Sequence, residues 1–307
     1  MRIVKVFYCN GYKFSKLKHR RNGNKLEKIV EYIFLICALF SILSLAVIVG
    51  FIFVKGTPAL FKIGFFNFIL GLKWSPQEEV FGVFPMIVAS LISTTGAVFL
   101  SFLVGLLTAI FLAEIAPKWI AMIFRPGVEL LAGIPSVVYG FFGLIVVVPL
   151  IDKWFGGGGN SLLAVIIILS IMILPTIISI SELSLRAVPK EYKEGSLALG
   201  ATHLQTIFKV LIPASKSGII TSIVLGTGRT IGETMAVILV AGNSPILPNS
   251  LFSRIRTLTA NIALEMGYAY GLHQDVLFAT GIVLFIFILV INLILNFMIY
   301  KSDEKTC

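Results

Sequence analysis

The chain has 307 residues, of which 57% are hydrophobic and only 13% are charged, and its mean hydropathy is +0.98. These values lie outside the range of soluble globular domains, so they exclude an ordinary water-soluble enzyme or binding module. The net charge of +10 would suit a nucleic-acid-binding protein. Whether the net charge indicates nucleic-acid binding depends on how the charged residues are distributed along the chain.

Six apolar stretches are long enough to cross a bilayer, which takes about 20 helical residues. They cover residues 29–54, 85–113, 128–150, 161–181, 217–242 and 276–300. Because hydrocarbon offers backbone polar groups no water to bond, these stretches predict α-helices and an all-α polytopic membrane protein. The expected domains are a basic N-terminal tail (1–28), a six-helix domain (29–300, with its core at 85–300) and a C-terminal tail (301–307).

Lys and Arg lie mainly on one side of the membrane in this arrangement. With a cytoplasmic N-terminus, 18 of the 25 basic residues face the cytoplasm, 6 lie in outer loops, and Arg229 alone lies within a span. This bias predicts a multi-pass protein of the cytoplasmic (inner) cell membrane, with both termini in the cytoplasm. The basic tail is then a topology signal that contacts membrane lipid, and we expect no nucleic-acid partner.

A polar segment separates the fourth and fifth spans. It reads Glu-Gly-Ser-Leu-Ala-Leu-Gly-Ala over 194–201 and is followed by Pro213. The pattern predicts a short helix, a turn at Gly200 where glycine can adopt a positive φ, and a second helix. Such a knob can dock into the groove of a partner protein. The spacing resembles the EAA loop of ABC importer permeases, here at 191–213, whereas spacing alone would also fit an ordinary amphipathic loop helix.

The third span contains a proline between glycines, in the sequence Gly-Ile-Pro-Ser-Val-Val-Tyr-Gly over 133–140. A proline inside a span interrupts the hydrogen-bond ladder and kinks the helix, and in transporters such breaks often line a cavity. The equally weighted alternative is a packing kink, in which Gly133, Gly140 and Gly143 only allow helices to approach each other.

The fifth span carries two ionisable residues, Arg229 and Glu233, in the sequence Gly-Thr-Gly-Arg-Thr-Ile-Gly-Glu-Thr over 226–234. An ionised residue at the bilayer centre costs about 2.5–3.5 kcal/mol on insertion scales, so it needs a partner or a wet cavity. The i, i+4 spacing predicts that the two side chains share one helix face and pair. The guanidinium suits a tetrahedral oxyanion, and Glu233 would hold Arg229, limit anion affinity or carry a proton. The alternative is a structural ion pair.

Motifs for other chemistry are absent from the sequence. No P-loop is present, so the chain is not expected to bind or hydrolyse nucleotide itself. The three cysteines form no CxxC and the three histidines no HExxH, so we expect no metal and no cofactor. The charged residues of the last outer loop either meet a soluble partner or form a plain hydrophilic loop. They are Arg254, Arg256, Glu265 and Asp275.

Several stretches together resemble the PstC family of phosphate ABC transporter permease subunits. They lie at 74–76, 81–85, 109–114, 133–143, 194–213 and 228–235, and the resemblance covers residues 29–300. It implies a type I ABC importer permease fold with a cytoplasmic coupling helix, and inward transport of inorganic phosphate. It also implies four kinds of partner: a sister permease subunit in a heterodimer, two copies of an ATPase subunit, an extracytoplasmic phosphate-binding protein and membrane lipid.

The resemblance also assigns roles to single residues. We expect two groups, one against the ATPase and one along the substrate path. The first is Glu194, Gly200 and Ala201, and the second is Arg229, Glu233, Thr230 and Ser136. Two other functions stay open at this point: an ABC permease for molybdate or sulfate, and a secondary anion transporter that uses Glu233 as a proton site and needs no ATPase.

Overall fold

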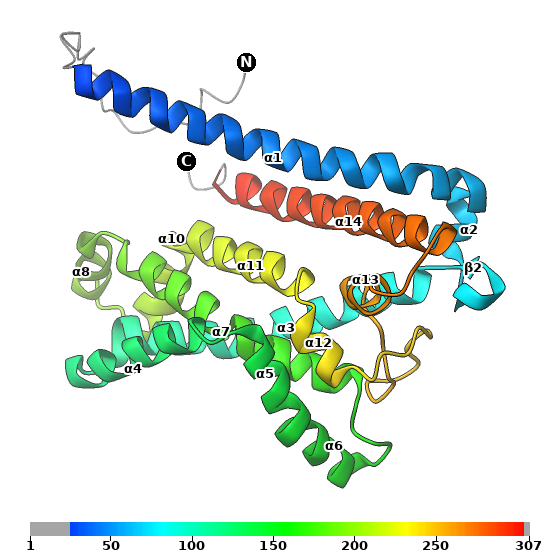
Figure 1. Cartoon of the computed structure of the whole chain (residues 1–307). Helices are drawn as coiled ribbons and strands as arrows, with labels where there is room; N and C mark the ends of the chain where they lie inside the picture. The colour runs from blue at the N-terminus through cyan, green and yellow to red at the C-terminus, as the bar shows by residue number, and fades with distance from the viewer. Residues whose placement is uncertain (1–24, 304–307) are drawn as a thin grey trace.

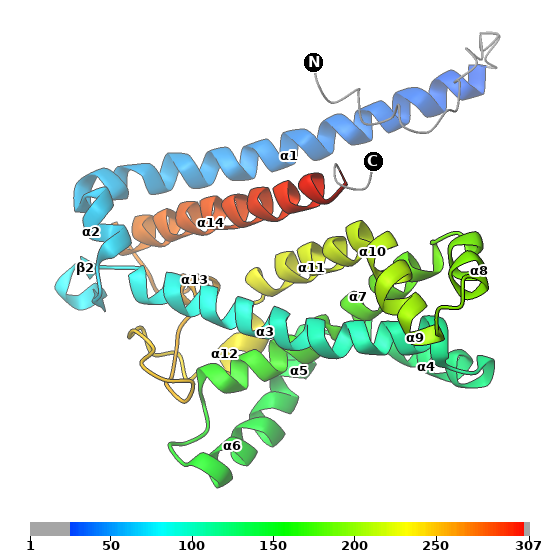
Figure 2. The ribbon, with the colours of Figure 1, turned by 180° about the vertical axis from the view of Figure 1, so that it is seen from behind.

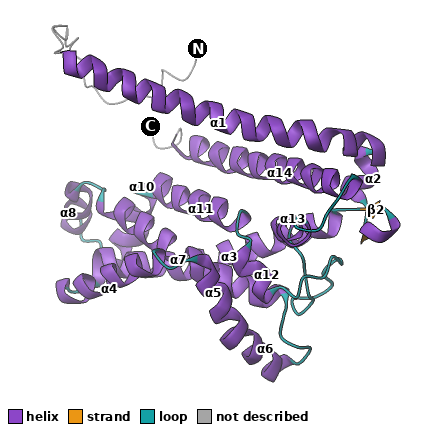
Figure 3. Cartoon of the chain, viewed as in Figure 1, coloured by secondary structure: helices purple, strands orange, loops and turns teal. Residues whose placement is uncertain are grey.

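The structure of the chain is a computed structural model that describes residues 25–303. Figures 1 and 3 show a helical molecule with one short hairpin of strands, which confirms the all-α class. Most of the predicted N-terminal tail and the last residues of the C-terminal tail lie outside the described residues.

The elements follow one another with short connections. The α-helices are α1 (Lys25–Ile63), α2 (Phe65–Leu70), α3 (Phe84–Ile110), α4 (Lys118–Ala132), α5 (Ser136–Phe142), α6 (Val148–Phe155), α7 (Leu162–Arg186), α8 (Lys190–Ala198), α9 (His203–Thr206), α10 (Ile212–Ala214), α11 (Lys216–Ile231), α12 (Met235–Val240), α13 (Leu258–Glu265) and α14 (Leu272–Asp303). The other elements are the π-helical segments η3 (Phe111–Ile115), η4 (Gly143–Val147) and η5 (Ile207–Leu211), the 3-10 turn η2 (Pro76–Glu78), and the antiparallel strands β1 (Trp74–Ser75) and β2 (Val80–Phe81).

Among the described residues, five helical segments are long and apolar enough to cross a membrane. They are Glu27–Ile63, Phe84–Ile115, Ser136–Phe155, Leu162–Arg186 and Leu272–Phe297. A sixth arises if His203–Ala214 and Lys216–Ile231, which meet at a bend of 67°, are counted as one span. The predicted set of six spans therefore agrees with the structure in number and order.

The third span contains the break predicted at its proline but starts later than predicted, and the fifth span is not continuous as predicted. Residues 128–132 of the third span belong to α4, and the apolar helix begins at Ser136 after a break at 133–135. Pro135 explains the break, because proline disfavours helical backbone at the residue before it and has no N–H to donate. The fifth span, predicted as continuous over 217–242, is interrupted between α11 and α12.

Helix α7 forms the centre of the molecule, and α3, α4, α5, α11 and α12 pack around it. Its buried side chains are mostly branched aliphatic, including Ile168, Ile173 and Ile177, none of which is exposed. Glycines let the neighbouring helices come close: a Cβ on Gly105 of α3 would lie 2.9 Å from the Ile177 side chain. This dense core fixes the helices that carry the candidate site.

Helices α1 and α14 form a separate layer, lying side by side in both views (Figures 1 and 2). The most apolar window of α1 has none of its residues buried, which is the surface expected of a helix that faces lipid.

The two ends of the molecule carry different elements. The start of α1, the end of α14 and the loop with α8 lie at one end, which we call the α8 end (Figures 1 and 2). Helix α2, the β1–β2 hairpin and α13 lie at the other, the α13 end. Such a layout is what an even number of spans produces.

Candidate functional site

The loop between α7 and α11 has the predicted helix–turn–helix form. Helix α8 ends at Ala198, Gly200 has a φ of 86°, and α9 follows. Thr202 caps α9 in a capping box with Gln205, so the second helix starts at a defined residue. A side chain at Gly200 would be strained in this left-handed conformation, which explains why the turn uses glycine.

This loop exposes apolar side chains at the α8 end. Leu199, at the tip of the turn, is 90% exposed, and Glu194 of α8 is exposed as well. The loop and the start of η5 expose three more apolar residues: Tyr192, Leu204 and Phe208. We call residues 190–206 with these side chains the knob. A large apolar residue that no described part of the chain covers is typical of a protein contact.

The knob is attached to the helical core at two places. Lys193 forms an ion pair of 2.5 Å with Glu114 in η3. Ile207 and Leu211 are buried against Ala109 of α3 and Leu185 of α7. A displacement of the knob would therefore move the ends of α3 and α7.

Ala201 lies behind the tip rather than on it. It is half-buried, and its backbone N–H donates to the carbonyl of Ser196 at 3.2 Å. The Ser196 hydroxyl lies 3.0 Å from that of Thr206, which joins α8 to α9. Of the three residues expected against the ATPase, Glu194 and Gly200 are on the surface, whereas Ala201 supports the turn.

Arg229 and Glu233 do not share a helix face, so the predicted i, i+4 pairing is wrong. Helix α11 ends at Ile231, and no ion pair joins the two side chains within residues 25–303. Glu233 instead accepts a hydrogen bond from the backbone N–H of Ala236 at 3.1 Å and so holds the first turn of α12. The Thr259 hydroxyl of α13 donates to the Glu233 carbonyl at 3.1 Å. Helix α11 thus ends with Gly232 as its C-cap, and the Glu233 carboxylate stabilises the first turn of the next helix.

The other two predicted path residues differ in how accessible they are. Thr230 is only 3% exposed, and its hydroxyl donates to the carbonyl of Gly226 at 2.8 Å. This hydroxyl is already used within α11. Ser136 is half-buried as the first residue of α5, and its side chain forms no hydrogen bond with any residue that the structure describes.

Tyr139 is a neighbour of Arg229 that sequence reasoning missed. Arg229 lies close enough for its charge to act on the Tyr139 hydroxyl, which donates to the carbonyl of Leu131 at 2.7 Å. This bond spans the break between α4 and α5. Helix α5 also approaches α12 closely, since a Cβ on Gly140 would lie 2.7 Å from the Cα of Ala236. Helices α5 and α12, each of which begins after one of the two breaks, therefore pack against each other, and Arg229 lies in the last turn of α11, directly before the second break.

The glycine–proline segment contains both the predicted break and the predicted close helix packing, at different residues, whereas the expectation that the break lines a cavity stays a prediction. Gly140 and Gly143 allow close packing, because a Cβ on Gly143 would lie 2.7 Å from Ile168 and from Val240. Gly133 and Pro135 instead frame the break beside Tyr139. The sequence could have indicated a role for Tyr139 at the break, because this residue follows Pro135 by four positions.

A buried ionic network lies at the α13 end. Glu265, which is 4% exposed, accepts hydrogen bonds from Trp74 Nε1 at 2.9 Å and Arg256 Nη1 at 2.5 Å. His273 Nε2 lies 2.8 Å from the same carboxylate. Partial burial raises the pKa of the Tyr268 hydroxyl, and the charge of Glu265 raises it further. The network ties the hairpin, α13 and α14 together, so Arg256 and Glu265 are not part of a plain hydrophilic loop.

Within residues 25–303, no group of three or more His, Cys, Asp or Glu side chains is arranged to hold a metal ion. Cys9 and Cys307 lie outside the described residues, and Cys37 is exposed on α1.

Comparison with known proteins gives the class of this fold. The chain is similar to the inward-facing MetNI methionine ABC transporter, with a TM-score of 0.58 and 20% identity over 75% of this chain and 99% of the other. A second crystal form of that transporter gives a TM-score of 0.57 at 21% identity, over 70% of this chain and 93% of the other. These similarities confirm the predicted ABC importer permease fold.

The sequence comparisons give the family. Residues 101–306 match the family described as binding-protein-dependent transport system inner membrane component, and the chain belongs to this family. It is 42% identical to the probable ABC transporter permease protein YqgH of Bacillus subtilis, over 91% of this chain and 94% of that protein. It is 32% identical to the phosphate transport system permease protein PstC of Haemophilus influenzae, over 94% and 98% of the two chains. A probable PstC of the archaeon Methanocaldococcus jannaschii is 34% identical, over 88% and 93%.

Proposed function

We propose that this chain is a permease subunit of an ATP-driven importer that moves inorganic phosphate inward across the cytoplasmic membrane. The observation that carries the proposal is the near full-length similarity to phosphate transport permeases of bacteria and an archaeon. The position of Arg229 in the last turn of α11, directly before the break, supports it, because a guanidinium offers the planar donors that a tetrahedral oxyanion accepts.

The proposed complex contains a sister permease subunit, two copies of an ATPase subunit and an extracytoplasmic phosphate-binding protein. The α8 end would face the cytoplasm, in agreement with the positive-inside bias. Glu194, Gly200 and the exposed Leu199 would then contact the ATPase, and the α13 end would face the binding protein. In this arrangement ATP is hydrolysed by the partner subunit, and this chain supplies the path.

The geometry supports a specific division of labour at the path. Arg229 attracts the anion, while Glu233 fixes the start of α12 through Ala236 and keeps a negative charge nearby. Because that charge repels an oxyanion, it would keep binding weak enough for release. Ser136 offers a hydroxyl at the start of α5. Thr230 serves the path through the backbone of α11 rather than by contact, since its hydroxyl is bonded internally.

The test is uptake of labelled phosphate at about micromolar concentration, where a binding-protein-dependent system of nanomolar to micromolar affinity operates. The host lacks its own high-affinity system and carries this chain with its neighbouring transporter genes. We expect saturable uptake that requires this chain and resists excess sulfate and molybdate. Uptake blocked by either competitor would move the substrate to that oxyanion, and uptake that survives disruption of the knob would favour a secondary transporter.

A further inference from the structure

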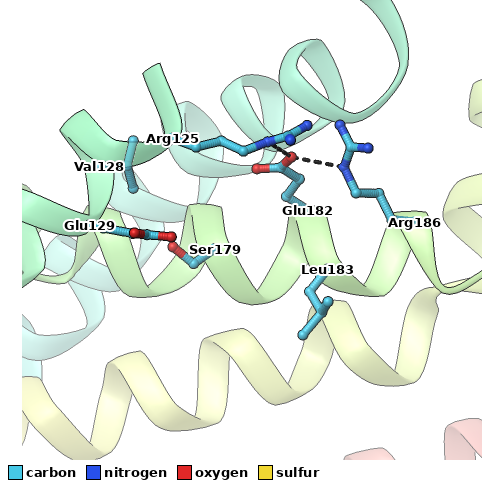
Figure 4. Close-up of a pocket in the computed structure, with 7 residues that line it drawn as sticks. All are labelled: Arg125, Val128, Glu129, Ser179, Glu182, Leu183 and Arg186. Carbon is cyan, nitrogen blue, oxygen red and sulfur yellow. Dashed lines mark hydrogen bonds and ion pairs between the residues drawn. The ribbon is translucent and has the colours of Figure 1, made fainter. Parts of the chain in front are cut away.

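A cavity that the path does not use lies at the α8 end, between α4 and α7. It has a volume of about 230 Å³. Figure 4 shows Arg125, Val128 and Glu129 from α4 facing Ser179, Glu182, Leu183 and Arg186 from α7. A water occupies about 30 Å³ in the liquid, so the cavity has room for a tetrahedral oxyanion or for several waters.

The two arginines share a single buried carboxylate. Glu182, 7% exposed, accepts from Arg125 Nε at 2.7 Å and from Arg186 Nε at 2.9 Å, and Figure 4 shows the arginines approaching it from opposite sides. One carboxylate neutralises only one guanidinium. The Glu182 cluster therefore carries one net positive charge, and Glu129, the other carboxylate of the lining, balances the charge of the cavity as a whole.

The arginines also keep unused donors. Arg186 Nη2 donates to the carbonyl of Leu112 in η3 at 2.8 Å, which leaves Nη1. Neither terminal nitrogen of Arg125 forms a hydrogen bond with the residues that the structure describes. Both side chains are partly accessible, at 39% for Arg125 and 42% for Arg186. Two guanidinium groups that lie on either side of Glu182 and keep free N–H donors can bind the oxygens of a phosphate group.

The rest of the lining orients a ligand along the cavity. Glu129 lies beside Ser179 at the end away from the arginines in Figure 4, so an anion would be held at the arginine end and repelled from the other. Exposed apolar side chains on the same helix α4, namely Trp119, Met122, Ile123 and Phe124, indicate that the cavity adjoins the membrane surface.

We propose that Arg125 and Arg186 bind a phosphate group at the α8 end, supplied by free inorganic phosphate or by the headgroup of a phospholipid. The inference stands on the geometry of α4 and α7, and it holds whichever anion the transporter carries. Its failure and the failure of the proposed function are therefore separate results.

The experiment measures modification of single arginines by phenylglyoxal in the purified transporter complex, quantified by peptide mass spectrometry. The complex is kept in a non-ionic detergent and stripped of phospholipid. With a Kd of about 1 mM, phosphate at about 10 mM should slow modification of Arg125 and Arg186 about tenfold, because the free fraction falls as 1/(1 + [L]/Kd). Exposed Arg254 at the α13 end is the internal control and should react at an unchanged rate.

Two arms distinguish the sources of the phosphate group. Protection by inorganic phosphate identifies the free anion, and protection only by phosphatidylglycerol in mixed micelles identifies a headgroup. Sodium chloride at matched ionic strength controls for screening. Equal protection by chloride, or none by either phosphate source, would overturn the proposal.

A variant tests the orientation within the cavity. Glu129→Gln removes the charge that repels the anion and should strengthen protection of Arg125 at the same phosphate or lipid concentration. Glu191→Gln, an equally exposed change on α8 outside the cavity, should leave it unchanged. Weaker protection in Glu129→Gln than in Glu191→Gln would contradict the proposed position of the phosphate group.

Discussion

Replacing Glu265 with Gln removes the negative charge on which three donors converge while it preserves the size of the side chain. Breaking a buried ion pair costs about 3–5 kcal/mol. The cost here should be lower, because Arg256 keeps its bonds to the carbonyl of Asn243 and to Asn261 Oδ1. The glutamine carbonyl can also still accept from Trp74. We therefore expect a loss of about 2–3 kcal/mol, since hydrogen bonds to a charged group contribute about 1.5–3 kcal/mol each.

The assay is thermal unfolding of the purified transporter at one fixed scan rate, because membrane complexes unfold irreversibly. At this scan rate we expect a lower apparent Tm for Glu265→Gln than for the unsubstituted transporter. The matched control is Glu78→Gln, which breaks the Lys73–Glu78 pair on the same hairpin. Those side chains are 64% and 57% exposed, and exposed pairs contribute at most about 1 kcal/mol. If both variants melt at the same temperature, the network adds no more than a surface pair and the reasoning is wrong.

Four further predictions concern transport. Gly200→Val places a β-branched side chain at a φ of 86°, so it should abolish uptake although the protein reaches the membrane at normal levels. The control Gly195→Ala adds a methyl group in open space and should be tolerated. Equal uptake by the two variants would show that the turn has no role in transport. Leu199→Asp should release the ATPase subunit in co-purification, and retained ATPase would show that the knob docks elsewhere. Arg229→Lys keeps the charge but loses the planar fork, so uptake should fall about tenfold or more, and unchanged uptake would make Arg229 structural. Glu233→Gln can still accept from Ala236, so the protein should fold and bind phosphate more tightly with slower turnover; an unaltered KM would show that its charge does not act on the anion.

The sequence predicted those parts of the fold that depend on hydropathy and on local turn chemistry. Apolar stretches of sufficient length gave the number and order of the spans, and Gly200 gave the turn of the knob. Hydropathy could not show the break between α11 and α12, nor which backbone group the Glu233 side chain bonds. The i, i+4 argument assumed an unbroken helix, so it placed Arg229 and Glu233 on one face. The sequence did contain one indication of the break, because Gly232 directly precedes Glu233 within the predicted span.

Long-range pairs could not be predicted from one sequence. Glu265 and Trp74 are 191 residues apart, and Arg125 and Glu182 are 57 residues apart. Each becomes a pair only after the helices have packed. The sequence analysis named Glu265 only as a charged residue of the last outer loop and did not single out Arg125 or Glu182, because the partners of these side chains depend on tertiary structure.

The knob and the candidate path lie on one continuous stretch of the chain. This stretch is a physical route by which the proposed ATPase contact could act on the path. The knob continues through α9 and η5 to the bend at Ser215, and α11 then runs to the break before Glu233. The 16 residues of α11 span about 24 Å at 1.5 Å per residue. The face of α11 against α7 is built from small residues, with Gly218 directly on Ser184 and with Ser222 hydrogen-bonded to Ser181.

Small residues let the start of α11 lie close against α7, while nearer the break Gly226 of α11 faces Ile177 of α7, so we expect a shift of α11 to require repacking there. Such a shift would move Arg229, which is on α11, relative to Tyr139, which is on α5. Glu233 would stay with α12 through its bond to Ala236. In such a shift, α11 would move with the knob, and α12, on the other side of the break, would stay with the core. A continuous helix with an Arg229–Glu233 pair would move both charges together and could not alter the field at the path.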